Sequence, residues 1–208
     1  QTSDGALRQG LLYDILGRRG HHDMREVTVE QFARRYVIDA RHADRVAQIA
    51  LQWFDELTPR KAKNESTRQL LAWACKLHEI GLSISHNGHH KHAAYILGKS
   101  DMPGFSKREQ ALLSDWVLAH NGKLTKVSHL AETTDHWLPP MCLRLATLFL
   151  RRRHVEELPE IHLSRQGKKF QVVINKQWLE EHPLTEFSLD SEIEQWKKLG
   201  LDLSIKPI

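Results

Sequence analysis

Apolar residues recur at every third or fourth position along much of this chain, which is the spacing of one face of an α-helix. The clearest stripe follows Asp39 and covers residues 46–57. A second stripe covers residues 70–77 and leads to Gly81, a residue type that commonly ends a helix. The pattern therefore predicts a mainly α protein.

Capping signals predict where further helices begin. Thr28 precedes Gln31 by three residues, and Ser106 precedes Glu109 by three, so both pairs are typical of a capping box. Another helix is expected over residues 88–97. We also expect a large helix after Pro139-Pro140 that covers residues 141–153, and its nearly continuous apolar character indicates burial.

The sequence changes in character after about residue 158. Residues 161–164 and 170–174 predict the two strands of a β-hairpin, because the turn residues Gln166-Gly167 lie between them. Two short helices and a final strand are expected at residues 178–181, 191–199 and 201–205. A small α/β unit therefore follows the helices.

Composition fits a globular protein and excludes few function classes. Of the 208 residues, 40% are hydrophobic and 27% are charged, and no apolar run approaches the roughly 20 residues that a membrane span needs. We expect no membrane partner and a cytoplasmic location, since no signal peptide is recognisable. Cys75 and Cys142 lie in apolar helical segments, which favours packing as free thiols over a disulfide.

The formal net charge of +4 favours an anionic partner. Arginine and lysine residues gather in short runs, at Arg18-Arg19, Arg151-Arg152-Arg153 and Lys168-Lys169. A solvated surface is the ordinary interpretation of any one such run. The arginine triplet also closes an apolar helix, where the helix dipole alone favours cations.

The pair His78-Glu79, followed by Ile80-Gly81, resembles the adjacent His-Asp pair that names the HD phosphohydrolases. Such enzymes hold one or two divalent metal ions that generate a hydroxide nucleophile. His42 resembles the first histidine of that family, and His89 and His92 resemble the extra histidines of two-metal members. The resemblance implies a candidate metal set of His42, His78, Glu79, His89 and His92.

This resemblance is incomplete at two positions. A glutamate replaces the aspartate of the pair, and Thr147 stands where the late aspartate would fall. A neutral hydroxyl supplies neither the coordination nor the charge compensation of a carboxylate. The sequence therefore favours an HD-like scaffold without a working metal site.

Each histidine also has an ordinary structural interpretation. His78 can be a hydrogen-bonded core residue. His89 and His92 share a helix face, whereas His90 points elsewhere. A phosphate at the start of their helix would need no metal. His120 and the remaining single histidines are expected to be ordinary polar residues.

Longer segments resemble the C-terminal half of the exopolyphosphatase and guanosine pentaphosphate phosphatase family. They are residues 5–13, 77–86, 92–97 and 100–105. The resemblance implies three parts: a connector from an actin-like lobe over residues 1–24, an HD-like helical domain over residues 25–157, and a small C-terminal α/β domain over residues 158–208.

The same resemblance implies that hydrolysis takes place in two N-terminal actin-like lobes, which hold Mg2+ in the parent enzyme. We expect no cofactor in the present residues. The expected partners are polyphosphate, a second copy of the chain and the actin-like lobes of the same chain, with no specific nucleic acid. The candidate polyphosphate-binding residues are Arg18, Arg19, His89, His90, His92, Arg151, Arg152, Arg153, Lys168 and Lys169.

Three hypotheses follow. The first is a non-catalytic region of an exopolyphosphatase that binds long polyphosphate and supports dimerisation. The second is a metal-dependent HD-type phosphohydrolase that acts on a phosphate ester or nucleotide. The third is an interaction module without a phosphate ligand. The sequence leaves open whether the parent is an exopolyphosphatase or a guanosine pentaphosphate phosphatase.

Overall fold

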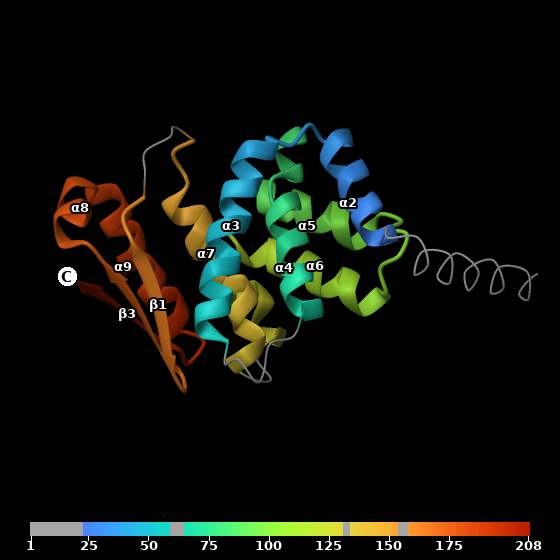
Figure 1. Ribbon diagram of the computed structural model, residues 1–208. Helices are drawn as coiled ribbons and strands as arrows, with labels where there is room; N and C mark the ends of the chain where they lie inside the picture. Colours follow the sequence, from blue (N-terminus) through green and yellow to red (C-terminus); the bar gives the residue numbers. More distant parts are fainter. Residues whose placement is uncertain (1–22, 59–64, 131–133, 154–157) are drawn as a thin grey trace, which may run out of the picture.

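The computed structural model describes residues 23–58, 65–130, 134–153 and 158–208. A group of helices is followed by a small unit with a three-stranded sheet (Figure 1). This arrangement confirms the predicted fold class. Most of the predicted connector, including Arg18 and Arg19, lies outside the described residues.

The helical part is built from α-helices joined by short 3-10 segments. In chain order the α-helices are α2 (Met24–Arg35), α3 (Ala40–Leu57), α4 (Glu65–Leu77), α5 (His89–Lys99), α6 (Lys107–Ala119) and α7 (Leu138–Phe149). The 3-10 segments are η2 (Ile80–Ser83), η3 (Leu124–Leu130) and η4 (Thr134–Trp137). Among the described helices, none has both the length and the apolar character that crossing a bilayer requires.

The C-terminal unit combines a hairpin with a parallel strand. It contains β1 (Ile161–Gln166), β2 (Lys169–Ile174), α8 (Lys176–Glu181), α9 (Pro183–Lys197) and β3 (Asp202–Pro207). β1 runs antiparallel to β2, as the predicted hairpin requires, and β3 pairs with β2 in parallel. A parallel pair needs a crossover connection, which α8 and α9 supply.

The helix starts predicted at Asp39 and Ser106 are confirmed. Asp39 accepts a hydrogen bond from the His42 amide at the start of α3, and Ser106 forms a complete capping box with Glu109. The capping box predicted at Thr28 is wrong, because α2 begins at Met24 after the N-cap Asp23. Thr28 is instead buried within α2, and its hydroxyl donates to the Pro103 carbonyl over 2.8 Å.

Gly81 does not end a helix in the way that the sequence predicted. α4 ends at Leu77, and Gly81 lies within η2. A β-carbon at this position would overlap the carbonyl oxygen of His89 in the first turn of α5. Only glycine therefore permits this close approach, which brings the segment after α4 against the start of α5.

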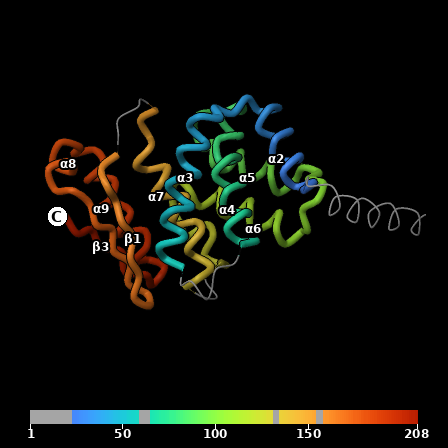
Figure 2. Tube along the Cα trace, in the orientation of Figure 1, coloured from blue at the N-terminus to red at the C-terminus, as the bar shows by residue number. Residues whose placement is uncertain are grey.

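The core runs through both parts of the molecule. α7 is buried almost all round, as predicted, and lies between α3 and the C-terminal unit (Figures 1 and 2). Buried apolar residues of the sheet belong to the same hydrophobic cluster as those of the helices. The Trp53 indole N–H also donates to the Ile161 carbonyl over 3.0 Å. Because residues on both sides of position 158 share one core, the predicted domain boundary there stays a prediction.

The two cysteines are packing residues. Cys75 and Cys142 are free thiols and fully buried, as the sequence predicted. Burial raises the pKa of each thiol, so neither forms the thiolate that metal binding and redox chemistry require.

Candidate functional site

A cleft of about 420 Å³ opens between the ends of the central helices. We call it the histidine cleft, because His42, His78, His86, His89 and His120 are among its lining residues. These side chains come from α3, from the segments that precede and begin α5, and from the end of α6. Arg144, Arg151 and Arg153, from α7 and the residues after it, line the same cleft.

The HD-like residues predicted from the sequence meet in this cleft. His42, His78 and Glu79 each offer one ligand atom, and these atoms lie within 4.8 Å of one another. His42 Nε2 is 3.8 Å from Glu79 Oε1, and the rings of His42 and His78 are 6.0 Å apart between centroids. The arrangement is what an HD-like scaffold would provide.

Burial keeps these histidines neutral. The His78 ring is 3% exposed, and its Nδ1 donates to the Cys75 carbonyl oxygen over 2.6 Å. Burial lowers the pKa of His78 to about 4 and also lowers the pKa of His42. At neutral pH both rings are therefore hydrogen-bonding groups without charge.

Arg153 contacts Glu79, the only carboxylate of this cluster. Its Nη2 donates to both oxygens of Glu79, over 2.8 and 2.9 Å, and its Nη1 donates to Asp39 over 3.2 Å. A divalent ion bound by Glu79 would lie next to this guanidinium and would be repelled by it. The side chain of Arg153 thus supplies the positive charge that a metal would otherwise bring.

Thr147 does not replace the missing aspartate. It lines the cleft, but its hydroxyl donates to the Arg144 carbonyl over 2.9 Å within its own helix. With one carboxylate already paired and no second one at this position, the residues do not fit a catalytic HD-type metal centre.

His120 is the main residue of the cleft that the sequence analysis missed. It is buried at the end of α6, and its Nδ1 donates to the Val117 carbonyl oxygen over 2.5 Å. Its Nε2 lies 3.2 Å from Nε2 of His89, and its ring centroid lies 5.2 Å from that of His78. The four side chains form a row in the order His42, His78, His120 and His89. The sequence offers only a weak signal, a histidine at the predicted end of a helix.

The histidines near the start of α5 separate in space. His89 lines the cleft, whereas neither His90 nor His92 does. His90 is buried, and its Nε2 accepts a hydrogen bond from Lys126 Nζ over 2.7 Å. Burial and the charge of Lys126 lower the pKa of His90 to about 4. Of the three predicted residues, only His89 is therefore placed to meet a ligand in the cleft.

Arg144 forms a buried ion pair across the two parts of the molecule. Its guanidinium contacts both carboxylate oxygens of Glu192 in α9, one of them over 2.7 Å, and its Nη1 donates to the Ala119 carbonyl over 2.7 Å. Arg144 is 5% exposed and Glu192 is 8% exposed. The pair fixes α9 against α6 and α7 and leaves little net charge at the floor of the cleft.

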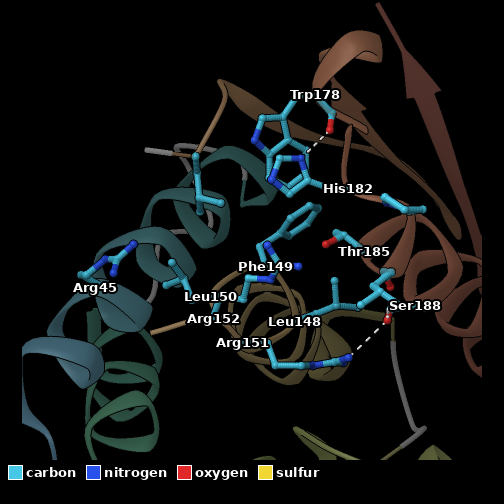
Figure 3. A pocket seen from close by; sticks show the side chains of 13 residues that line it. Arg45, Leu148, Phe149, Leu150, Arg151, Arg152, Trp178, His182, Thr185 and Ser188 are labelled. Atoms are coloured by element: carbon cyan, nitrogen blue, oxygen red, sulfur yellow. Dashed lines mark hydrogen bonds between the residues drawn. The ribbon is translucent and has the colours of Figure 1, made fainter. Parts of the chain in front are cut away.

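A second hollow lies between α7 and the C-terminal unit, with a volume of about 210 Å³ (Figure 3). We call it the arginine groove, because Arg45, Arg151 and Arg152 line it. Its other lining residues are mainly apolar, and among the described lining residues none is acidic. The ring of His182 stacks on Trp178 at 3.9 Å between centroids, which gives the groove a rigid wall.

Arg151 belongs to both hollows. It lines the histidine cleft and the arginine groove, and its Nη1 donates to the Ser188 hydroxyl over 3.3 Å (Figure 3). Arg45 was not a candidate from the sequence, because it lies far from the arginine triplet along the chain. Lys168 and Lys169 are exposed at the hairpin turn and line neither hollow.

The comparison with protein families identifies the chain. Residues 24–193 match the family described as Ppx/GppA phosphatase, domain III. The match includes all the residues named above for the histidine cleft and the arginine groove, and it extends across residue 158 into the C-terminal unit. This chain therefore belongs to the Ppx/GppA phosphatase family.

Proposed function

We propose that this region of an exopolyphosphatase-family protein holds long polyphosphate, while hydrolysis takes place in actin-like lobes of the parent chain. Mg2+ would bind in those lobes. In the same proposal the region supports a dimer and works in the cytoplasm. The family membership supports the phosphatase context, and the arrangement of arginines supports the binding role.

The observation that carries the proposal is the position of Arg151 at the junction of two adjoining hollows. A polyphosphate chain carries about one negative charge per phosphate, so it needs a series of cations rather than one pocket. Arginine suits this role because its planar guanidinium donates two parallel hydrogen bonds to phosphate oxygens. A chain that passes Arg151 would meet Arg45 and Arg152 on one side and the histidine cleft on the other.

The two hollows would contribute differently to such binding. In the cleft, Arg144 is paired with Glu192, and Arg153 is paired with Glu79 and Asp39. The buried histidines are neutral, so the cleft offers hydrogen-bond donors with little net charge. The groove has three arginines and no acidic side chain among its described lining residues. We therefore expect Arg45 and Arg151, which line the groove, to supply most of the electrostatic attraction.

Binding of labelled polyphosphate, measured by fluorescence anisotropy at low and physiological salt, tests the proposal. The groove variant is R45Q/R151Q/R152Q. The matched control is K168Q/K169Q/K198Q, which removes the same number of charges from exposed lysines outside both hollows. We expect the groove variant to lose affinity by at least about tenfold and to show a smaller salt slope, by about 0.7 for each lost phosphate contact.

Two outcomes would contradict this proposal. Equal losses in the groove variant and in the control would mean that general surface charge, including Lys168 and Lys169, attracts polyphosphate. Absence of binding at either salt concentration would exclude the role for this region. Short phosphate chains provide a further control, because they cannot span the groove and the cleft together.

A further inference from the structure

The two edges of the sheet differ in how they are covered. β1 and β3 are the edge strands, because the strand order is β1-β2-β3. α3 covers the β1 edge, where the Leu163 amide donates to Glu56 Oε2 over 2.8 Å. The Ile161 carbonyl accepts from the Trp53 indole over 3.0 Å at the same edge. β3 lies on the side of the sheet away from α3 (Figure 1), and within the described ranges no strand pairs with its outer side. An uncovered edge strand is a template for a further strand.

Hydrogen bonds to β2 determine which backbone groups of β3 face outward. The Asp202 amide donates to the Lys168 carbonyl over 3.0 Å, so the backbone of Asp202 faces β2. Backbone groups alternate in direction along a strand, so the N–H and C=O of Leu203 and Ile205 point away from β2. In the part of the chain that the structure describes, these outward groups have no hydrogen-bond partner. Pro207, the last residue of β3, has no N–H that could be left unpaired.

The exposed side chains of β3 form a charge pattern that is complementary to itself. Asp202, Ser204 and Lys206 are exposed and share one face of the strand. The acid and the base are placed symmetrically about the serine. Among the described residues, neither Asp202 nor Lys206 has an ion-pair partner. If two copies of β3 pair antiparallel about Ser204, the Asp202 of each copy lies opposite the Lys206 of the other.

The backbone groups fit the same register. Antiparallel pairing about Ser204 places Leu203 of one copy opposite Ile205 of the other, and these are the residues whose N–H and C=O face outward. Each such pair exchanges two hydrogen bonds. The neighbouring registers that also match the outward groups bring Asp202 or Lys206 opposite Ser204 and lose both charge pairs. Backbone and side chains therefore select one register.

We propose that β3 is a self-association edge, through which two copies of the chain join their three-stranded sheets into one continuous sheet. The occupant is a second copy because the charge pattern is symmetric about Ser204, which a different partner strand would not require. Such a contact is two-fold symmetric, so it closes as a dimer and does not continue into a fibre. The proposal deepens the dimer part of the proposed function and rests on it; it does not involve polyphosphate.

Charge exchange at the edge tests the proposal by sedimentation equilibrium over a range of protein concentrations. The variants K206D and D202K should each weaken the dimer by at least about tenfold, because both cross-strand pairs become like-charge pairs. A mixture of the two variants should form a heterodimer, and the double variant D202K/K206D should recover the homodimer, because both restore opposite charges. The matched control K123D makes the same charge change at an exposed lysine of the helical part and should leave the dimer unchanged.

A cysteine at the symmetry axis tests the register. Opposed residues of a pair without hydrogen bonds have α-carbons about 4.5 Å apart, which a disulfide can span. The variant S204C should therefore form a cross-linked dimer under mild oxidation. The control is S164C, because Ser164 is exposed in the same row of the sheet but lies on the covered strand β1. Cys75 and Cys142 are buried and should not react.

The outcomes separate this contact from the rest of the proposed function. A dimer that tolerates K206D and D202K would overturn the β3 contact and leave dimerisation to another surface. Weakening by both variants without recovery in the mixture or in the double variant would overturn the antiparallel register, as would equal cross-linking of S204C and S164C. An unmodified chain that stays monomeric would overturn the contact together with the dimer. Polyphosphate binding is measured independently of all these results.

Discussion

The histidine cleft and the arginine groove share Arg151 but differ in how their charges are compensated. In the cleft each of Arg144 and Arg153 contacts a carboxylate, and the buried rings are neutral. In the groove, Arg151 donates to the neutral hydroxyl of Ser188, and none of the described lining residues is acidic. The number of basic residues around a hollow is therefore no measure of its electrostatic attraction for an anion. That attraction depends on whether the basic side chains are already paired with carboxylates.

The largest expected effect is a loss of folding stability when the buried ion pair of Arg144 and Glu192 is broken. The variant R144M leaves Glu192 charged and without its partner, so it should destabilise the fold by about 3–5 kcal/mol. Urea unfolding measures this loss. The double variant R144M/E192L should recover most of it, because two apolar side chains replace the pair. A single variant as stable as the unmodified chain would show that Arg144 is not structural.

The cleft should also make stability depend on pH. The pKa of His78 is about 4 in the folded chain, against an ordinary value of 6.5. Between these two values the unfolded state binds more protons, so stability is complete above pH 6.5 and falls as the pH decreases towards 4. The loss attributable to His78 is on the order of 3 kcal/mol.

Urea midpoints measured with chelator between pH 4 and 8 check this dependence. The variant H78Q provides the comparison, because removing this imidazole should remove its share of the pH dependence. A flat profile for the unmodified chain would show that His78 is not held neutral by burial.

A comparison of two single variants tests directly whether pairing with a carboxylate reduces an arginine's contribution to polyphosphate affinity. R151Q should weaken polyphosphate binding by about tenfold, the loss of one charge-assisted contact. R153Q should weaken it less, because Arg153 already donates to Glu79 and Asp39. Fluorescence anisotropy at one salt concentration gives both values. Equal or reversed effects would contradict the division between a charged groove and a compensated cleft.

The smallest effect is expected at the hairpin turn. The variant K168Q/K169Q removes two exposed cations that line neither hollow. Its effect on polyphosphate affinity should stay within about threefold at physiological salt, because distant surface charges are screened. A larger loss would extend the binding path onto the C-terminal sheet.

Local sequence signals located most helices and strands correctly. Asp39, Ser106 and the turn at Gln166-Gly167 act through hydrogen bonds or backbone geometry within a few residues, so they can be read without the fold. The capping box predicted at Thr28 was wrong because the same residue pattern also occurs in the middle of a helix. There the Thr28 hydroxyl donates to the Pro103 carbonyl instead. The prediction that Gly81 ends a helix was wrong because this glycine permits a close contact with α5, and a contact between remote segments leaves no local sequence pattern.

In the candidate site, too, some residues could be predicted from the sequence and others depended on tertiary contacts. The spacing of His42, His78 and Glu79 predicted residues that do meet, because the fold that the pattern resembles brings their helices together. Arg45, His120 and the partner of Arg153 were not predictable. Arg153 and Glu79 are separated by 74 positions along the chain, and only packing decides that they touch.

The sequence by itself determined the helical class, the C-terminal hairpin and the segments that mark the family, because periodicity and short motifs depend on neighbouring residues. Only the tertiary structure decided which cations are compensated, which histidines form the row in the cleft and which residue brings the two hollows together. Charge pairing and ligand geometry depend on distances of a few ångströms between remote segments. Those distances are set by the packing of α7 against the helices and the sheet.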